Sequence, residues 1–410
     1  MDWEARHLIE ALRSGIPSRR VGKYFSSSRR ELIDSIKEDM SEVAEGKSKG
    51  RVIIGKYGDG KTHMLNTIFS LSQEDNYVVS LVSISKETPP NNLVGLYKRI
   101  IENTYLPSSN ESGILGVFEG LSPESEKANE MFLYALKKLP SDKLYYVFRT
   151  LLSSSGHRDD DIDALDADLR GYFVNLGTLK KLYTKYCDEK ASFRESFVQK
   201  KHTFDYFCFM AKLFRTMGYK GWVILFDEAE LIGRMPRKSR ENAYLNINRF
   251  LNPVPLLEGV YSVFAFSSSF SDEVIAGKNE YSEVALSTKS EEERRAMTDT
   301  LDRITKGTEL KSLSMEELNA SVESIVDLYR KAYDRNIECD VPSLTAMASR
   351  SGFLLRTKIR AAVEALDQIY QYGDIGEVQA VKVKGEDISE MISSYFDMDD
   401  GEKPEKGENE

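Results

Sequence analysis

Short apolar runs alternate with amphipathic stretches over most of the chain. Runs rich in β-branched and aromatic residues predict buried strands. They stand at residues 51–55, 77–85, 221–230 and 261–269, and a short fifth candidate stands at residues 308–313. Apolar positions at helical spacing predict helices at residues 1–14, 29–45 and 61–73, with a loop at 15–28. Strands that alternate with helices predict an α/β fold, in which a parallel sheet has helices on both faces.

One interval between predicted strands is far longer than a simple crossover. Residues 91–214 separate the second strand from the third, and they carry apolar residues at helical spacing. A structureless loop of this length is uncommon inside a compact domain, so the interval predicts a large helical insertion. Within it, the acidic run "DDDIDALDADL" at residues 159–169 lacks the glycine and the terminal glutamate of a calcium-binding loop. We therefore expect this run to begin a solvated helix.

From Ser314 onward the pattern is helical throughout. Ser314 and Glu317 have the spacing of a helix capping box, and long amphipathic segments follow them. These features predict a small helical domain at residues 314–396. The final residues, 397–410, are charged and contain no apolar side chain after Met398. That composition predicts a disordered acidic tail.

Composition places the protein among soluble globular proteins. Hydrophobic residues make up 41% and charged residues 30% of the chain, as is typical of that class. No apolar run approaches the roughly 18 residues of a membrane span, and the N-terminus lacks the apolar core of a secretory signal. We therefore expect a cytoplasmic protein that makes no contact with a membrane.

Charge and the metal-binding residue types argue against two further classes. A net charge of −10 is unlike that of a domain that coats nucleic acid, so contact with duplex DNA would need a local basic patch. Three cysteines occur without CxxC spacing, and four histidines are scattered along the chain. This distribution argues against a zinc site and indicates buried or incidental thiols.

The segment "GKYGDGKTH" at residues 55–63 combines glycines with a lysine and a threonine. Gly55, Gly60, Lys61 and Thr62 fit the pattern G-x-x-x-x-G-K-[ST], between a predicted strand and a predicted helix. A chance glycine-rich turn is the alternative, but it does not explain why strand, spacing and helix agree. We expect Lys61 to reach the β- and γ-phosphates of ATP and Thr62 to bind Mg²⁺. The nucleotide-contacting set is completed by the rest of the segment, Tyr57, Gly58, Asp59 and His63.

Paired acids follow the predicted third strand. The run "WVILFDEAE" places Asp227 and Glu228 at the carboxyl end of that strand, where ligands of open α/β sheets bind. We expect Asp227 to hold Mg²⁺ through water and Glu228 to polarise the water that attacks the γ-phosphate. A surface acidic turn is the alternative, and a buried apolar strand that ends in two acids disfavours it.

The next strand ends in serines. In "VFAFSSSF", Ser267 and Ser268 stand at the tip of the strand beside the Asp-Glu strand. A hydroxyl there can donate to the γ-phosphate or to the attacking water, while an ordinary loop serine is the equal alternative.

Two arginines are candidates for stabilising transition-state charge. Arg303 stands just before the predicted fifth strand, and Arg356 opens a C-terminal helix. An arginine supplied by a neighbouring subunit or by a lid can act in this way. For each residue a surface ion pair is the alternative, and Arg294 and Arg295 are alternatives to Arg303 for action in trans.

Together, the phosphate loop, the Asp-Glu strand, the polar strand tip and the C-terminal helices resemble the AAA+ ATPases. The segment "SGFLLR" resembles the opening of the lid helix in the origin-recognition branch. A narrower resemblance is to the ATP-binding proteins of bacterial BREX-type phage-defence systems. It rests on "IEALRSGIPSRRVGKYF", "GKYGDGKTH", "DEAEL" and "LKSLSMEELNASVESIVDLYRKAYD". It covers both ends of the chain but not the insertion.

These resemblances imply a fold and a function. They imply an AAA+ core over residues 1–313, which contains the insertion at 91–214, and a lid over residues 314–396. They also imply a Mg²⁺-dependent ATPase that forms a homo-oligomer and assembles or remodels other defence-system proteins on DNA. Origin-type initiators carry a winged-helix domain after the lid, for which this sequence leaves no room, so DNA contact by that route is not expected.

Other functions compete with this one. A nucleotide switch or signalling scaffold, which turns ATP over slowly and makes no direct DNA contact, is the main alternative. A small-molecule kinase does not explain the lid or the insertion. A helicase is disfavoured because no second motor domain follows the "DEAE" motif.

Overall fold

The computed structural model describes most of the chain, as two compact units. Its described residues are 2–15, 29–107, 109, 111–118, 120–154, 160–334, 336–352 and 354–373. The sheet unit spans residues 17–324, and the helical unit combines residues 1–16 with residues 325–410. The loop expected at 15–28, apart from Gly15, and the tail expected at 397–410 lie outside the described residues.

A six-stranded sheet, in the order β3-β2-β4-β5-β1-β6, forms the centre of the sheet unit. The four long strands and the short fifth strand expected from the sequence are all present. The strands are β1 (Lys49–Gly55), β2 (Val78–Ser83), β3 (Thr104–Tyr105), β4 (Trp222–Asp227), β5 (Val260–Ser267) and β6 (Thr308–Glu309). Strand β5 separates β1 from β4, so the strand before the glycine-rich loop and the strand before the paired acids are not neighbours.

The sheet is mixed rather than wholly parallel, which corrects the expectation from the sequence. Strand β3 pairs antiparallel with β2, through Val79 with Tyr105 and Ser80 with Thr104. The buried hydroxyl oxygens of Ser80 and Thr104 lie 2.8 Å apart in a hydrogen bond. A two-residue strand is too short to show alternation in the sequence, and β3 lies inside the interval that we expected to be helical. The other pairings of the sheet are parallel.

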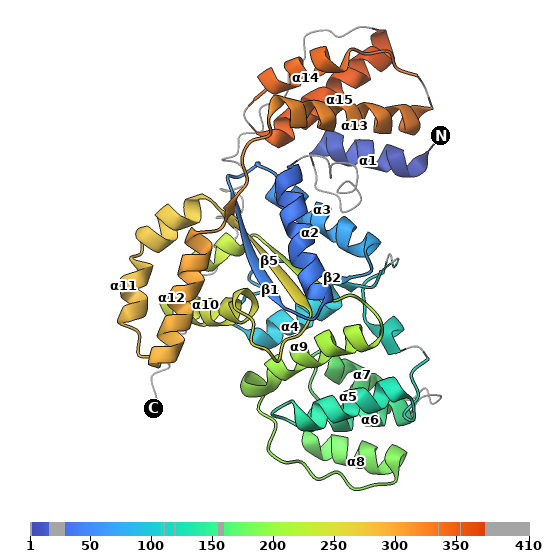
Figure 1. The fold of residues 1–410 in the computed structure, drawn as a ribbon, viewed down its shortest axis with the longest axis vertical. Coiled ribbons are helices and arrows are strands. Elements are labelled where there is room, and N and C mark those ends of the chain that lie inside the picture. Colours follow the sequence, from blue (N-terminus) through green and yellow to red (C-terminus); the bar gives the residue numbers. More distant parts are fainter. Residues whose placement is uncertain are drawn as a thin grey trace, which may run out of the picture. The chain divides into compact units, whose positions relative to one another are not determined.

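Alternate side chains of the strands serve two hydrophobic layers, as expected for a sheet with helices on both faces. Val223 and Leu225 pack with helices α2 (Arg30–Ala44) and α3 (Lys61–Glu74). Ile224 and Phe226 pack in a larger core with α4 (Leu93–Glu102), α9 (Gln199–Thr216), α10 (Arg237–Leu251) and α12 (Glu291–Thr305). Figure 1 shows α2 and α3 on one side of β1 and β5, and α10 and α12 on the other.

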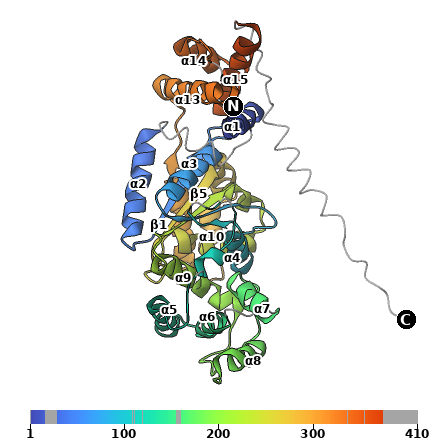
Figure 2. The same ribbon diagram turned by 90° about the vertical axis from the view of Figure 1, so that its right-hand side faces the viewer.

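Four further helices gather at one end of the sheet unit (Figure 2). They are α5 (Glu126–Lys137), α6 (Lys143–Ser153), α7 (Asp160–Leu169) and α8 (Leu176–Cys187). Helix α9 joins this group to the sheet, since it packs against α5 and places Phe207 on Trp222 of β4. The acidic run begins a helix as expected, α7, but the expectation that this helix is solvated is wrong for its second half, where Asp166 and Asp168 are buried. Its last turn carries a buried ion pair, because Asp168 accepts from Lys143 of α6.

Short helices complete the sheet unit. They are the 3-10 helices at Leu115–Phe118 and Ala229–Arg234 (η3), the π-helix at Ser271–Ala276 and α11 (Glu280–Ala285).

The helical unit contains both ends of the described chain. Its helices are α1 (Trp3–Ser14), the second half of α13 (Met315–Tyr333), α14 (Val341–Arg350) and α15 (Leu355–Tyr372). The guanidinium of Arg13 donates to both carboxylate oxygens of Asp367, at 2.9 and 2.7 Å. The first helix therefore groups with the C-terminal helices, whereas the boundaries expected from the sequence placed it in the core.

No helix in the described part of the chain is long and apolar enough to cross a membrane.

Candidate functional site

The glycine-rich segment forms a tight loop between β1 and α3. Gly58 and Gly60 have φ angles of 86° and 91°, which L side chains rarely adopt. Gly60 is also the N-cap of α3 and offers no side-chain acceptor to the first turn. The first N–H groups of a helix lack partners within it. The start of α3 therefore presents donors and a positive dipole end to an anion.

Lys61 is folded against the loop that precedes it. Its side chain is 8% exposed, and Nζ donates to the carbonyls of Gly55 at 3.0 Å and Lys56 at 3.3 Å. Asp59 closes the loop, because its carboxylate accepts the N–H of Lys56 at 2.7 Å. Tyr57, on the same loop, is 49% exposed. The ammonium of Lys61 thus lies inside the curve of the loop and donates to two neutral carbonyl oxygens.

The paired acids lie where β4 ends. Asp227 is buried, and its carboxylate accepts the N–H of Glu228 at 2.9 Å. Glu228 adopts the left-handed conformation, with a φ of 55°, which costs a non-glycine residue about 1 kcal/mol. Its side chain is exposed. Although the side chain reaches solvent, partial burial of its carboxylate, together with the charges of Asp227 and Glu230, raises the pKa of Glu228 above its ordinary value.

The serines at the tip of β5 lie between the loop and the acids. Ser267 stands opposite Gly55 in the parallel register, and the N–H of Ser268 donates to the Gly55 carbonyl at 3.1 Å. The hydroxyl of Ser267 lies 3.2 Å from that of Ser269. Since β1, β4 and β5 are parallel and adjacent in the order β4-β5-β1, their carboxyl ends bring loop, serines and acids to one edge.

Glu230 belongs to this edge, and the sequence analysis did not assign it. Its carboxylate accepts the N–H of Ser267 at 3.1 Å. Desolvation raises its pKa, while Lys61 opposes that shift. The motif "DEAE" contains this residue, so the sequence carried a signal, but nothing in the spacing separates it from Glu228.

Arg29 is a second residue that sequence reasoning missed. Its buried guanidinium donates to the carbonyls of Asp59 at 2.6 Å and Lys311 at 3.1 Å, and its backbone N–H donates to Glu317 at 2.8 Å. Burial and the charge of Arg29 lower the pKa of His63 to about 4, so that imidazole is neutral at pH 7. No pattern in the sequence links Arg29 to the loop.

Among the candidate arginines, Arg303 lies away from this edge within its sheet unit. Arg303 donates to the carbonyls of Gly50 and Leu251, and Gly50 lies near the opposite, amino end of β1. Arg294 donates to the Lys289 carbonyl at 2.7 Å. Arg295 pairs with Glu291 on the surface, and Arg356 lies in the first turn of α15 in the helical unit.

The predicted magnesium ligands are both hard oxygen donors. Thr62 supplies a hydroxyl in the first turn of α3, and Asp227 supplies a buried carboxylate. Mg²⁺ is held in many proteins by one or two such groups, with phosphate oxygens and water completing its octahedron. Among the described residues no group of three or more His, Cys, Asp or Glu side chains could hold a metal ion. The donor set therefore fits a cation that arrives together with phosphates.

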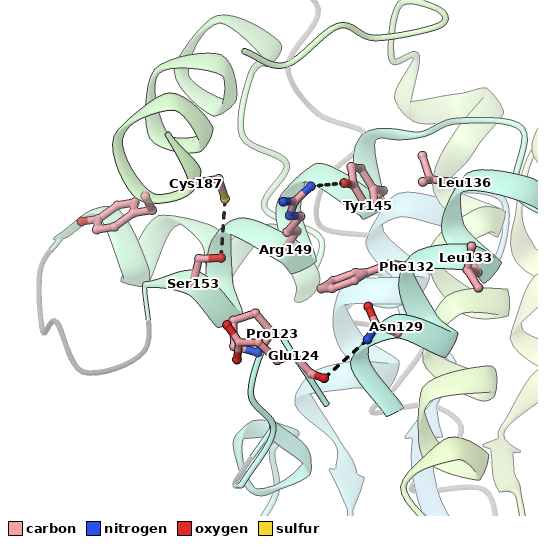
Figure 3. A pocket seen from close by; sticks show the side chains of 11 residues that line it. Pro123, Glu124, Asn129, Phe132, Leu133, Leu136, Tyr145, Arg149, Ser153 and Cys187 are labelled. Atoms are coloured by element: carbon pink, nitrogen blue, oxygen red, sulfur yellow. Dashed lines mark hydrogen bonds between the residues drawn. The ribbon is translucent and has the colours of Figure 1, made fainter. Parts of the chain in front are cut away.

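A separate cavity of about 940 Å³ lies among α5, α6 and α8 (Figure 3). Phe132, Tyr145 and Arg149 line it, and the thiol of Cys187 lies 3.5 Å from the Ser153 hydroxyl. The guanidinium of Arg149 already donates to tyrosine hydroxyls and to a carboxylate, those of Tyr145, Tyr183 and Glu189. The carboxylate of Glu189 balances the charge of Arg149. We therefore do not assign phosphate binding to this cavity.

The fold and the site define an α/β protein with a glycine-rich loop, a lysine and paired acids at one edge of a mostly parallel sheet. The chain belongs to the family of BREX system ATP-binding proteins BrxC/D, whose model matches residues 2–120 and 189–385, well over half of the chain. This membership confirms the narrower resemblance drawn from the sequence. The interval between the two matched segments, residues 121–188, contains α5, α6, α7 and α8. The model also matches residues 91–120 and 189–214, so the resemblance covers both ends of the insertion, which was not expected from the sequence. A search of curated proteins finds no match.

Proposed function

We propose that the protein is a Mg²⁺-dependent ATP hydrolase of the AAA+ type, which couples ATP binding and hydrolysis to assembly or remodelling of partner proteins on DNA. Family membership supports an ATP-dependent role in phage defence. The observation that carries the proposal is the placement of β5 between β1 and β4. This order puts the tip serines between a phosphate-binding loop and two acids, at the edge where α/β proteins bind ligands.

The loop supplies the binding step in this proposal. The N–H groups at the start of α3 face the phosphates, and Lys61 exchanges its carbonyl acceptors for the β- and γ-phosphate oxygens. A charged acceptor makes a stronger hydrogen bond than a neutral carbonyl, so the exchange favours the bound state. Thr62 and Asp227 would hold Mg²⁺, which offsets the charge of the phosphates when it is bound.

The acids and the serines supply the hydrolytic step. Glu228 is exposed at the strand end and has a raised pKa, which makes its carboxylate a better acceptor for a proton of the attacking water. Ser267 and Ser268, on the neighbouring strand tip, would donate to the γ-phosphate or orient that water.

The helices at the C-terminal end, together with α1, supply the lid in this proposal, and residues 17–324 with their helical insertion form the core. Arg356 would act from the lid, and Arg303 would act on the site of a neighbouring subunit. Both roles need an oligomer or a moving unit, in keeping with the way arginines stabilise transferring phosphoryl groups in other nucleotide hydrolases.

Glu228→Gln tests the proposal. The amide keeps the shape of the side chain but cannot take a proton, so we expect normal ATP binding by calorimetry and a loss of steady-state turnover of at least 100-fold. Glu258→Gln, two residues before the amino end of β5, is the matched control and should turn over ATP as the wild type does. Wild-type turnover in Glu228→Gln would contradict the assigned role.

A slow nucleotide switch that makes no direct DNA contact is the second candidate, and the net charge of −10 favours it. Turnover measured with and without duplex DNA separates the two functions. Mass measurement in solution, with and without ATP and DNA, adds the oligomeric state. DNA-stimulated turnover and an ATP-dependent assembly on DNA support the remodelling ATPase, whereas tight ATP binding with turnover that ignores DNA supports the switch.

A further inference from the structure

The backbone leaves β4 sharply, and this turn brings Glu230 back over the neighbouring strand. Asp227 is the last residue of β4, and Glu228 then takes its left-handed conformation. The 3-10 helix η3 starts at once, with the N–H of Leu231 donating to the Glu228 carbonyl at 3.0 Å. Strained backbone of this kind is retained where the surrounding structure fixes it, often at functional sites. Here it aims the second glutamate of "DEAE" at the tip of β5.

An N–H group at the tip of β5 needs an acceptor on the side where Glu230 lies, because the pairing with β4 ends before the tip. The pairing of β4 with β5 ends at Phe226 with Phe264, whereas β5 continues to Ser267. The N–H of Ser268 is taken by the Gly55 carbonyl of β1. Successive N–H groups of a strand point to opposite neighbours, so the N–H of Ser267 faces the side that β4 has left. The carboxylate of Glu230 replaces the missing strand at 3.1 Å.

From this geometry we infer that Glu230 is a positioning residue for ATP hydrolysis, which ties the serine tip of β5 to the loop that carries Asp227 and Glu228. The Gly55 carbonyl fastens the other side of the same tip to the phosphate loop. The tip of β5 is thus held from both sides, through the N–H of Ser267 on the side of the paired acids and the N–H of Ser268 on the side of the glycine-rich loop. The inference rests on the proposed function, because positioning matters only if water attacks a phosphate at this edge.

A positioning role has a specific kinetic signature. Binding of ATP depends on the phosphate loop and Lys61, which Glu230 does not bond. Hydrolysis depends on the mutual placement of Ser267 and Glu228, and an error of about 1 Å in such placement can cost 100-fold in rate. Loss of the Glu230 acceptor should therefore lower kcat while leaving KM and nucleotide affinity nearly unchanged.

Two substitutions of nearly equal size test the inference. Glu230→Gln keeps an acceptor oxygen for the N–H of Ser267, and Glu230→Met fills the same space without one. We expect Glu230→Met to lower kcat at least tenfold, with KM and calorimetric ATP affinity within threefold of wild type. Glu230→Gln should keep at least half of the wild-type kcat. If Glu230→Met does not fold, Glu230→Asp replaces it: the shorter side chain withdraws the acceptor, and the same fall in kcat is expected.

The other results overturn the inference. A wild-type kcat in Glu230→Met shows that the bond does not position the site. Equal loss in the Gln and Met variants assigns the effect to the charge of Glu230 rather than to its hydrogen bond. A rise in KM with kcat unchanged would make Glu230 part of nucleotide binding. Wild-type protein that binds ATP but never hydrolyses it overturns the proposed function itself, and this outcome is distinct because it appears before any Glu230 variant is measured.

Discussion

The ammonium of Lys61 donates to the carbonyl of Gly55 at 3.0 Å, so the cation of the glycine-rich loop is held by the loop itself. ATP would replace these neutral acceptors with charged ones. Lys61→Ala removes the ammonium group that binds the β- and γ-phosphates in our proposal. We expect ATP affinity to fall at least tenfold, or about 1.4 kcal/mol, by calorimetry.

The same loop offers a control for Lys61. Lys56 is a lysine of the same loop, but its side chain is exposed, whereas that of Lys61 is buried within the loop. Lys56→Ala should therefore keep ATP affinity within threefold of wild type. Unchanged binding in Lys61→Ala, or equal loss in both variants, would contradict the phosphate-loop assignment.

Arg303 is tested by mixing two inactive variants. If it acts on a neighbouring subunit, Arg303→Ala and Lys61→Ala are each inactive, and a mixed oligomer regains part of the turnover at interfaces that pair an intact loop with an intact arginine. Steady-state ATPase measurements on a titration of the two variants check this. A monomeric protein, or a mixture without recovery, leaves Arg303 with its observed bonds to the carbonyls of Gly50 and Leu251.

Asp205 of α9 makes stability depend on pH. Burial raises its pKa to about 6 in the folded protein, against about 3.9 in an unfolded chain. The folded state therefore holds this proton more tightly, and stability falls as pH rises from about 4 to 6. Asparagine can still accept the N–H of Ser141, which lies 3.2 Å from the carboxylate. We expect Asp205→Asn to stabilise the protein by about 1–3 kcal/mol at pH 7.

The control for Asp205 is pH itself. In urea unfolding experiments the gain from Asp205→Asn should shrink as pH falls from 7 to 5, because the wild-type carboxyl becomes protonated in the folded state. A gain that is independent of pH, or a loss of stability at pH 7, would show that ionised Asp205 is accommodated without cost.

The buried pair between Lys143 and Asp168 should behave as one unit. Asp168 also accepts from the hydroxyl of Tyr206 at 2.6 Å and the N–H of Val174 at 2.7 Å, so three donors converge on it. Lys143→Met leaves a buried carboxylate without its cation, and we expect a loss of about 3–5 kcal/mol in the free energy of unfolding. The double variant with Asp168→Asn should recover part of that loss, since it removes both charges. Additive losses in the double variant would show that the two charges are not coupled.

Sequence patterns predicted the strands, the loop and the acids at the carboxyl edge of the sheet, but not all of the contacts among them. Strand β1, α3, β4 and β5 could be predicted because apolar runs and motif spacing are local properties. The place of β5 beside β4 was expected from the sequence. Its pairing with β1 on the other side was not, because it depends on contacts over long sequence separations, which periodicity does not encode. The antiparallel β3 was missed because two residues carry no period. Glu230 was visible in "DEAE", yet only the turn at Glu228 shows that its carboxylate reaches Ser267.

The helical unit is built from two segments that lie far apart in the sequence, and this has a consequence for the synthesis of the protein. Helix α1 buries Ala5, Leu8, Ile9 and Leu12, and the helices of its unit come from residues 325 onward. Synthesis proceeds at about 5–20 residues per second, so the first helix leaves the ribosome on the order of tens of seconds before α15 exists. The sheet unit is meanwhile complete, since it comes from one continuous stretch. Helix α1 therefore waits for its packing partners until the sheet unit has been synthesised, and its apolar face has to be kept from other contacts during that time.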